Sequence, residues 1–152
     1  MSNLLFDRDC LILDACCVIN LAASRLMRPI LEILPVRLAI AAEVKQKEVL
    51  IAPSNDPDDT LPDESLDELI EMGLLQEVDF TSEDEATTVV DLAALGLDMG
   101  EAISGAIAIH RNWAIATDDN RAIRVLRTRN ESIRTMTTPE IIHFWANHAG
   151  PD

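Results

Sequence analysis

The sequence predicts an α/β fold in which helices cover a mostly parallel central sheet. Short apolar runs without a polar face, at residues 10–13 and 113–116, are typical of buried parallel strands. Segments of helical periodicity follow and separate these runs. Strands that alternate with helices favour a parallel sheet flanked by helical layers.

Length and composition indicate one globular domain over residues 1–152. Hydrophobic residues make up 48% of the chain, and a chain of this size buries roughly 70% of its unfolded surface. Aromatic residues make up only 3% and Tyr is absent, so the core must consist of aliphatic side chains. Stacking of bases on aromatic platforms is therefore not expected. No apolar run is long enough to cross a bilayer, and no membrane partner is expected.

Periodicity and turn residues divide the first half of the chain into alternating strands and helices. A Leu-Pro pair at residues 34–35 ends one short helix. The alternation after it favours a strand over residues 36–40, although residues 36–44 also fit a single helix. Residues 53–62, rich in Asp, Ser, Asn and Pro, predict an acidic loop insertion. The predicted elements are a strand at 10–13, a helix at 17–24, a short helix before 34, a strand at 36–40 and a helix at 41–48.

Two capping boxes organise the second half. Ser82 with Glu85, and Asp98 with Glu101, each place an acid three positions after an N-cap residue, so each pair opens a helix. We assign Asp98 to capping. The predicted elements are helix 64–72, strand 74–78, helices from 82 to near 96 and from 98 to about 110, strand 113–116, helix 120 to about 129, strand 133–136 and a helix opened by Thr138-Pro139.

The net charge of −15 is concentrated in one block. Residues 54–101 hold sixteen Asp and Glu and no Lys or Arg, whereas the remainder has eleven acids and twelve bases. Such a block repels phosphate backbones, which argues against a sequence-blind nucleic-acid coat protein. Its simplest interpretation is a solvated face that aids solubility.

Cysteine and histidine usage gives little support for a disulfide framework or a zinc site. The cysteines show no CxxC spacing, and the N-terminus shows no secretory pattern, so we expect a reducing cytoplasm and buried thiols. The histidines are scattered without zinc-ligand spacing. The residues concerned are Cys10, Cys16, Cys17, His110, His143 and His148.

Carboxylates follow both buried strands. Asp14 comes directly after the first, and Asp118 and Asp119 come shortly after the second. Ligands in open α/β sheets bind at the carboxyl ends of strands where the strand order reverses, so these acids are expected to face one crevice. Glu101 and Glu43, each near the start of a predicted helix, can join them. The alternative for each acid, taken singly, is a helix cap.

Clustered carboxylates raise one another's pKa, and a bound cation relieves this repulsion. Oxygen ligands select hard ions, so the expected cofactor is Mg²⁺ or Mn²⁺. Such ions activate water for attack on phosphorus without a protein nucleophile. The sequence holds no GxSxG, Walker or GxGxxG motif. Two rival classes that also bind Mg²⁺ through aspartates fit less well. A receiver domain would need an acidic pair on the first strand and a Lys late in the chain, but no Lys follows Lys47. A dehalogenase-type phosphatase would need Asp-x-Asp after the first strand, which residues 14–16 lack.

Three segments resemble the motifs of PIN domains in the same order. Residues 13–21 (LDACCVINL) resemble the opening motif, residues 99–102 (MGEA) the central acidic helix, and residues 116–121 (ATDDNR) the strand that supplies the last acid. Glu43 lies between the first two of these segments and matches the one remaining acid of the PIN pattern in order and rough spacing. The resemblance covers about residues 10–145. It implies a three-layer α/β/α sandwich, Mg²⁺- or Mn²⁺-dependent ribonuclease activity, often as a VapC-type toxin paired with an antitoxin, and a homodimer.

The resemblance assigns roles residue by residue. The acidic quartet corresponds to Asp14, Glu43, Glu101 and Asp119, and Asp118 is a fifth acid whose role is not separable from that of Asp119. The expected metal ligands are Asp14, Glu101, Asp119 and Asp118. Thr117 is expected to orient a water or phosphate, and Asn20 and Arg121 are the other substrate-binding candidates.

Two departures from the family pattern bear on these assignments. Cys16 replaces a Ser or Thr that bonds the metal-bound carboxylate in many relatives, which predicts loss of that contact. Arg121-Ala122 replaces the usual Asp-Phe. Arg121 and Arg124, one helical turn apart, are placed to clamp a phosphodiester, or alternatively pair with the protein's own acids. The alternative to an enzyme is a catalytically silent PIN-like interaction module.

Overall fold

The structure is a computed structural model that describes residues 6–47 and 65–149. Within these residues five strands form one sheet in the order β3-β2-β1-β4-β5, and every adjacent pair is parallel. The sequence predicted a mostly parallel sheet, and the described sheet is parallel throughout. The strands are β1 (Cys10–Leu13), β2 (Arg37–Ala41), β3 (Gln76–Val78), β4 (Ala114–Ala116) and β5 (Arg134–Met136).

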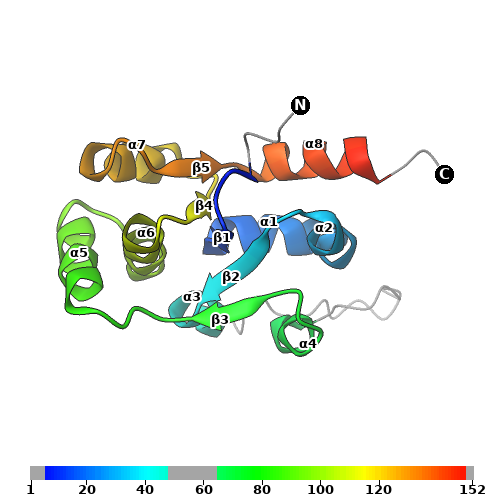
Figure 1. Cartoon of the computed structure of the whole chain (residues 1–152), viewed down its shortest axis with the longest axis horizontal. Coiled ribbons are helices and arrows are strands. Elements are labelled where there is room, and N and C mark those ends of the chain that lie inside the picture. The colour runs from blue at the N-terminus through cyan, green and yellow to red at the C-terminus, as the bar shows by residue number, and fades with distance from the viewer. Residues whose placement is uncertain (1–5, 48–64, 150–152) are drawn as a thin grey trace.

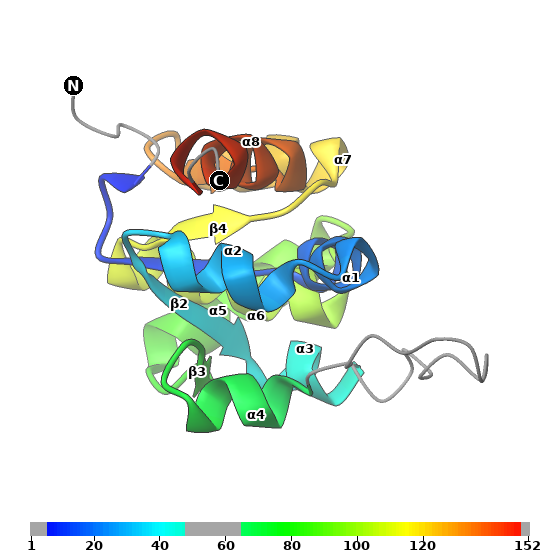
Figure 2. The ribbon, with the colours of Figure 1, turned by 90° about the vertical axis from the view of Figure 1, so that its right-hand side faces the viewer.

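Helices cover both faces of the sheet and confirm the three-layer α/β/α sandwich (Figure 1). In that view α5, α6 and α7 lie on one side and α1, α2, α4 and α8 on the other, and Figure 2 looks onto the second of these layers, with the sheet behind it. The helices are α1 (Ala15–Ser24), α2 (Met27–Ile33), α3 (Ala42–Lys47), α4 (Leu66–Glu71), α5 (Glu83–Ala94), α6 (Met99–Arg111), α7 (Asn120–Arg129) and α8 (Thr138–His148). None of these helices combines the length and the apolar character needed to cross a membrane.

The strand order reverses between β1 and β4. From the central β1 the chain adds β2 and β3 on one side, then returns to add β4 and β5 on the other. The backbone N–H of Asp14 donates to the carbonyl oxygen of Ala116 at 2.9 Å, which extends the β1–β4 pairing to the ends of both strands. The acids that follow these strands therefore lie at one edge, as the sequence analysis required.

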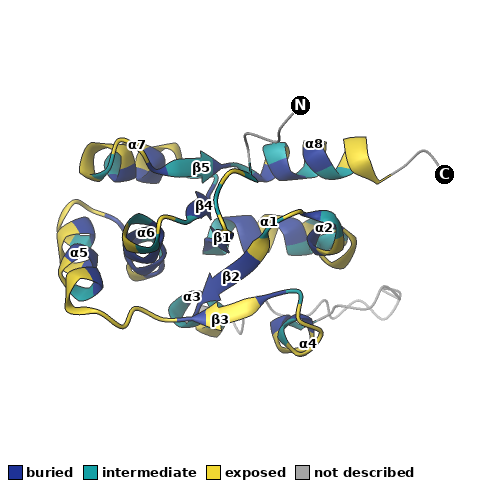
Figure 3. Cartoon of the chain, viewed as in Figure 1, coloured by how far each residue is buried: buried dark blue, intermediate teal, exposed yellow. Residues whose placement is uncertain are grey.

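The core is aliphatic, as composition predicted. All four residues of β1 and all three of β4 are buried, and Figure 3 shows this burial along the middle of the sheet. Burying each Leu or Ile side chain contributes about 1.5–3 kcal/mol. Gly105 lets α6 pack closely, because a Cβ atom there would lie 2.5 Å from Leu126 Cδ2 of α7 and 3.2 Å from Leu92 Cδ1 of α5.

Helix starts follow the predicted capping chemistry. The boxes of Ser82 with Glu85 and of Asp98 with Glu101 are both present. A third box, Thr137 with Glu140, opens α8 one residue before the predicted Thr-Pro start. The segment after Pro35 forms β2 and then α3, which decides against a single helix there. The predicted loop at residues 53–62 lies outside the described residues.

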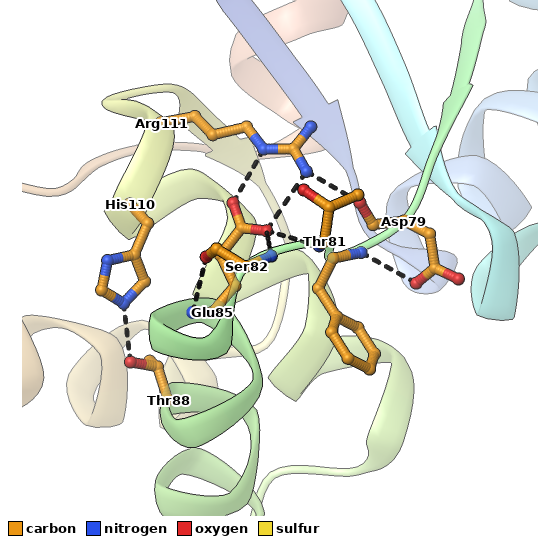
Figure 4. A network of polar contacts seen from close by, with 8 residues as sticks. Asp79, Thr81, Ser82, Glu85, Thr88, His110 and Arg111 are labelled. Atoms are coloured by element: carbon orange, nitrogen blue, oxygen red, sulfur yellow. Dashed lines mark hydrogen bonds and ion pairs between the residues drawn. The ribbon is translucent and has the colours of Figure 1, made fainter.

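An ion pair beneath the N-terminus of α5 ties that helix to the end of α6 (Figure 4). Glu85 is buried, and its Oε2 accepts a hydrogen bond from Arg111 Nε at 2.8 Å. Its Oε1 accepts from the backbone N–H groups of Thr81 and Ser82 at 2.8 and 3.3 Å. Burial acts to raise the pKa of Glu85, but these donors outweigh it and lower the pKa from 4.5 to about 2.

We predict that Glu85→Gln lowers the free energy of unfolding by about 2–3 kcal/mol at pH 7. Because the folded-state pKa is depressed, this contribution is complete above pH 4.5 and is lost as pH falls towards about 2. Urea denaturation at pH 7 and at pH 3 measures the difference between the wild type and the variant. The exposed neighbour Glu83 supplies the control Glu83→Gln, and a difference as large at pH 3 as at pH 7 would contradict the prediction.

Candidate metal centre at the carboxyl edge of the sheet

Asp14 is a buried carboxylate with one unpaired oxygen. It follows β1 directly and is only 3% exposed. Its Oδ2 accepts hydrogen bonds from Thr117 Oγ1 at 3.2 Å and from Cys16 Sγ at 3.7 Å, whereas its Oδ1 is buried without a hydrogen-bond partner. Burial raises the pKa of Asp14. An unpaired buried carboxylate oxygen is costly, and a bound cation or water would remove that cost.

Glu101 and Asp119 form a carboxyl pair at the starts of two helices. Glu101 Oε1 accepts from the backbone N–H of Asp98 at 2.9 Å, within the capping box of α6. Asp119 Oδ1 caps α7 by accepting from the backbone N–H groups of Arg121 and Ala122 at 2.9 and 3.2 Å. The two carboxyl groups also share a hydrogen bond. Both acids are therefore helix caps and close neighbours at once.

This pair shares a proton near neutral pH. Burial, together with the hydrogen bond to Asp119, raises the pKa of Glu101 from 4.5 to about 7. The pKa of Asp119 is lowered by the hydrogen bond from the Ala122 N–H and by the proton on Glu101. The negative charge of Asp14 also raises the pKa of Glu101, which places all three acids in one electrostatic neighbourhood.

The acids are close but do not form a ready-made metal cage. Within the described residues, no three His, Cys, Asp or Glu side chains are arranged so that together they could hold a metal ion. Glu101 and Asp119 point their carboxyl groups at each other, and each is also held by backbone donors. Metal binding at this edge would require the pair to release its shared proton and separate.

Thr117 connects Asp14 and Asp119 through its side-chain hydroxyl. Its side chain is fully buried, and its Oγ1 donates to Asp14 Oδ2 and accepts from the backbone N–H of Asp119 at 3.3 Å. The expectation that Thr117 orients a water or phosphate stays a prediction, because these two contacts join its hydroxyl to the two acids only. The contacts fix Asp14 relative to Asp119.

Cys16 retains the contact that its replacement of Ser or Thr was expected to remove. Its Sγ lies 3.7 Å from Asp14 Oδ2 and 3.4 Å from Thr117 Oγ1, and it accepts from the backbone N–H of Asp118 at 3.3 Å. The expectation of a lost contact is therefore wrong, because the larger sulfur atom reaches all three groups. The PIN resemblance had pointed to this position, where many relatives place a Ser or Thr with the same role.

Asp118 is bound by α1 and α8, and its carboxylate oxygens accept from Asn20 and Thr138. Its Oδ1 accepts from the backbone N–H of Thr138 at 2.6 Å, and its Oδ2 accepts from Asn20 Nδ2 at 2.6 Å and from Thr138 Oγ1. These bonds fasten α1 and the start of α8 to the end of β4. Asp119, and not Asp118, is thus the partner of Glu101, and the amide of Asn20 is engaged by Asp118.

Glu43 lies in the first turn of α3, two residues after β2. Since β2 pairs with β1 through Ile40 and Leu13, Glu43 follows the strand next to Asp14 at the same edge. Its side chain is half-buried. None of the hydrogen bonds that join the other acids reaches it, so its participation remains a prediction.

The arginines divide into two groups. Arg111, Arg129 and Arg134 form ion pairs with Glu85, Asp91 and Asp7, as the alternative of self-pairing requires. Arg121 and Arg124 are exposed and form no ion pair or side-chain hydrogen bond with residues 6–47 or 65–149. Arg121 helps to lower the pKa of Asp119, but neither it nor Arg124 is held in a direct ion pair by the described residues.

Comparison with known proteins supports the fold. The crystal structure of PAE2754 from Pyrobaculum aerophilum is similar to this chain with a TM-score of 0.53 and 14% sequence identity, over 97% of this chain and 100% of that chain. Identity this low shows a shared fold alone. No protein-family model and no curated protein matches the sequence. The PIN resemblance thus stands on the motifs quoted above.

We predict that Asp118→Asn lowers the free energy of unfolding by about 1–3 kcal/mol, because the amide nitrogen would face a donor from Thr138 or Asn20. Asp119→Asn is the matched control. Asn is as good an N-cap as Asp, so we expect this control to change stability by less than about 1 kcal/mol. Chemical denaturation of both variants tests the assignment, and a larger loss in Asp119→Asn would reverse it.

Proposed function

We propose that this protein is a Mg²⁺- or Mn²⁺-dependent endoribonuclease that hydrolyses RNA phosphodiester bonds at the carboxyl edge of its sheet. The observation that carries the proposal is the unpaired, buried Oδ1 of Asp14, which lies at the strand-order switch point in the electrostatic neighbourhood of the Glu101–Asp119 pair. Asp14, Glu101 and Asp119 are the proposed ligands, and Glu43 is the fourth acid.

The donor set fits a hard divalent ion. All the proposed ligands offer carboxylate oxygens, the donors that Mg²⁺ and Mn²⁺ prefer. Asp14 offers an oxygen that no protein group satisfies. Glu101 and Asp119 repel each other once both are ionised, and a cation favours that ionised state.

When bound, the ion supplies a water of lowered pKa and neutralises charge on the leaving oxygen. The chain's own residues prepare for this. Thr117 and Cys16 hold Asp14 Oδ2, which leaves Oδ1 as the oxygen without a hydrogen-bond partner. Glu101 holds a proton near neutral pH that it can give up as the ion binds. No side chain has to act as a nucleophile.

The PIN resemblance extends the proposal to cellular role. It supports a toxin of a toxin–antitoxin pair, with an antitoxin protein as partner and a homodimer as the assembly. A reducing cytoplasm fits the three free thiols, of which Cys10 and Cys17 are buried. Burial raises the pKa of Cys10 to about 11 and that of Cys17 to about 12, so both remain unreactive thiols at neutral pH.

A second candidate is a PIN-like module that binds a partner without turnover. The observation that favours it is that no three acids in the described residues are arranged to hold a metal ion. Measurements of RNA cleavage and of Mn²⁺ affinity distinguish this binding module from the proposed enzyme.

We predict that the protein cleaves labelled single-stranded RNA in the presence of Mn²⁺ and that Asp14→Asn reduces cleavage to background. The change removes the charge of Asp14 while nearly preserving its shape. Asp84→Asn, which neutralises an exposed acid at the start of α5, should retain full activity. Equal cleavage by the wild type and Asp14→Asn would contradict the proposal, and absence of cleavage by the wild type would favour the binding module.

We also predict that Glu101→Gln weakens Mn²⁺ affinity, measured by calorimetry, by at least about tenfold. Glu140→Gln is the matched control, because Glu140 occupies the same capping-box position in α8. If both variants bind Mn²⁺ as the wild type does, Glu101 is a helix cap only.

A further inference from the structure

Two arginines on α7 remain available to an external ligand. Further along this helix, Arg127 donates to Thr135 Oγ1 at 3.0 Å and Arg129 pairs with Asp91 at 3.5 Å. Arg121 and Arg124 are exposed, and neither forms an ion pair or side-chain hydrogen bond within the described part of the chain. This is unexpected in a protein of net charge −15, where acidic partners are abundant.

The position of Arg121 does not favour helix stability. It follows Asn120 in the first turn of α7, and that turn contains no acidic residue. A positive charge near a helix N-terminus opposes the helix dipole and costs about 0.3–1 kcal/mol. The N-cap Asp119 offsets part of this cost, because the charge of Arg121 helps to lower the pKa of Asp119.

The turn between α5 and α6 provides a surface for this guanidinium. A Cβ atom at Gly96 would lie 2.0 Å from Arg121 Nη2 and 3.2 Å from Cζ, so the guanidinium rests against the Gly96 backbone. Gly96 also has a φ of +104°, and the N–H of Leu97 donates to the carbonyl of Leu92 at 3.2 Å to close the turn. A side chain at residue 96 would displace Arg121. The guanidinium thus lies against this turn, and no described residue accepts a hydrogen bond from its N–H donors.

The two arginines extend from the acids in a defined direction. Asp119 is the N-cap of α7, Arg121 lies in its first turn, and Arg124 follows one turn later. Residues at this spacing have Cβ atoms about 5–6 Å apart on one face. Guanidinium groups bind phosphate through paired N–H donors, so two of them in a row suit successive phosphates of one strand.

Exposed apolar side chains beside the turn favour a single strand over a duplex. Leu95 and Met99, on either side of the Gly96 turn in sequence, are 51% and 48% exposed. Unpaired bases can contact apolar side chains, whereas a duplex keeps its bases stacked inside.

We propose that Arg121 and Arg124 form a phosphate track for single-stranded RNA, which holds the strand on one side of the bond to be cut. This inference rests on the proposed function, because the track begins beside Asp119. Its contacts are to phosphates, so it does not select a base sequence, and the preference for single strands comes from exposed Leu95 and Met99 beside it.

The test measures binding separately from cleavage. Asp14→Asn serves as the background for all variants, and fluorescence anisotropy with a short labelled oligouridylate gives Kd at several salt concentrations. Arg121→Gln and Arg124→Gln should each raise Kd about fivefold or more and reduce the slope of log Kd against log salt by about 0.7. Arg127→Gln, with the same charge change on the same helix, should leave Kd within about twofold. Equal weakening in all three variants, or weakening in none, overturns the track.

Further measurements test the substrate class and distinguish failure of this proposal from failure of the proposed function. If duplex RNA binds as tightly as the single strand and is weakened equally, the assignment to single strands is wrong. Displacement of the RNA by poly-glutamate as effective as that by unlabelled RNA would indicate a docking surface for an acidic protein and would overturn the proposal. Weakened binding by Arg121→Gln and Arg124→Gln supports the track even if the wild type cleaves no RNA, in which case only the nuclease proposal fails.

Discussion

The parallel pairing of β1 with β4 is the constraint on which the site depends. These strands are far apart in sequence, yet Leu13 lies opposite Ala116, and the N–H of Asp14 donates to the Ala116 carbonyl at 2.9 Å. The order of the sheet reverses here, so helices leave towards opposite faces and open the edge between them. Thr117 then ties Asp14 to the Asp119 backbone through one buried hydroxyl. The positions of Asp14 and Asp119 relative to each other depend on this junction.

The carboxylates that cap helices are the same ones proposed to bind metal. Glu101 and Asp119 each accept backbone N–H groups at a helix start, where the dipole stabilises a negative charge. These bonds fix the two side chains with little freedom. The arrangement keeps two like-charged groups side by side, at the cost of a proton that one of them retains.

Most of the fold could be predicted from local patterns. Apolar runs located β1 and β4, and capping boxes located the starts of α5 and α6, because both depend on residues that are near in sequence. The start of α1 was predicted two residues late, since the Cys16-Cys17 pair gives no local signal for a helix. The strand order was not predicted, because it depends on pairing between segments that are distant in the chain.

The site could be predicted less completely. The convergence of Asp14, Glu101 and Asp119 at one edge followed from topology, but side-chain direction did not. Asp118 and Asp119 are adjacent, and only the structure shows that Asp118 is bonded to Thr138 and Asn20. Local sequence carries no information about such partners, because they come from helices distant in the chain.

Asp119 is both the N-cap of α7 and a proposed metal ligand, and the two roles together restrict which residues can replace it. Ala at this position would remove a possible metal ligand and leave the first N–H groups of α7 without an acceptor, at about 0.5–2 kcal/mol. Asn, Ser or Thr would keep the helix intact while abolishing the charge. A homologue that is folded but no longer catalytic would therefore be expected to carry Asn, Ser or Thr at this position. The residue found here would help to distinguish active homologues from inactive ones.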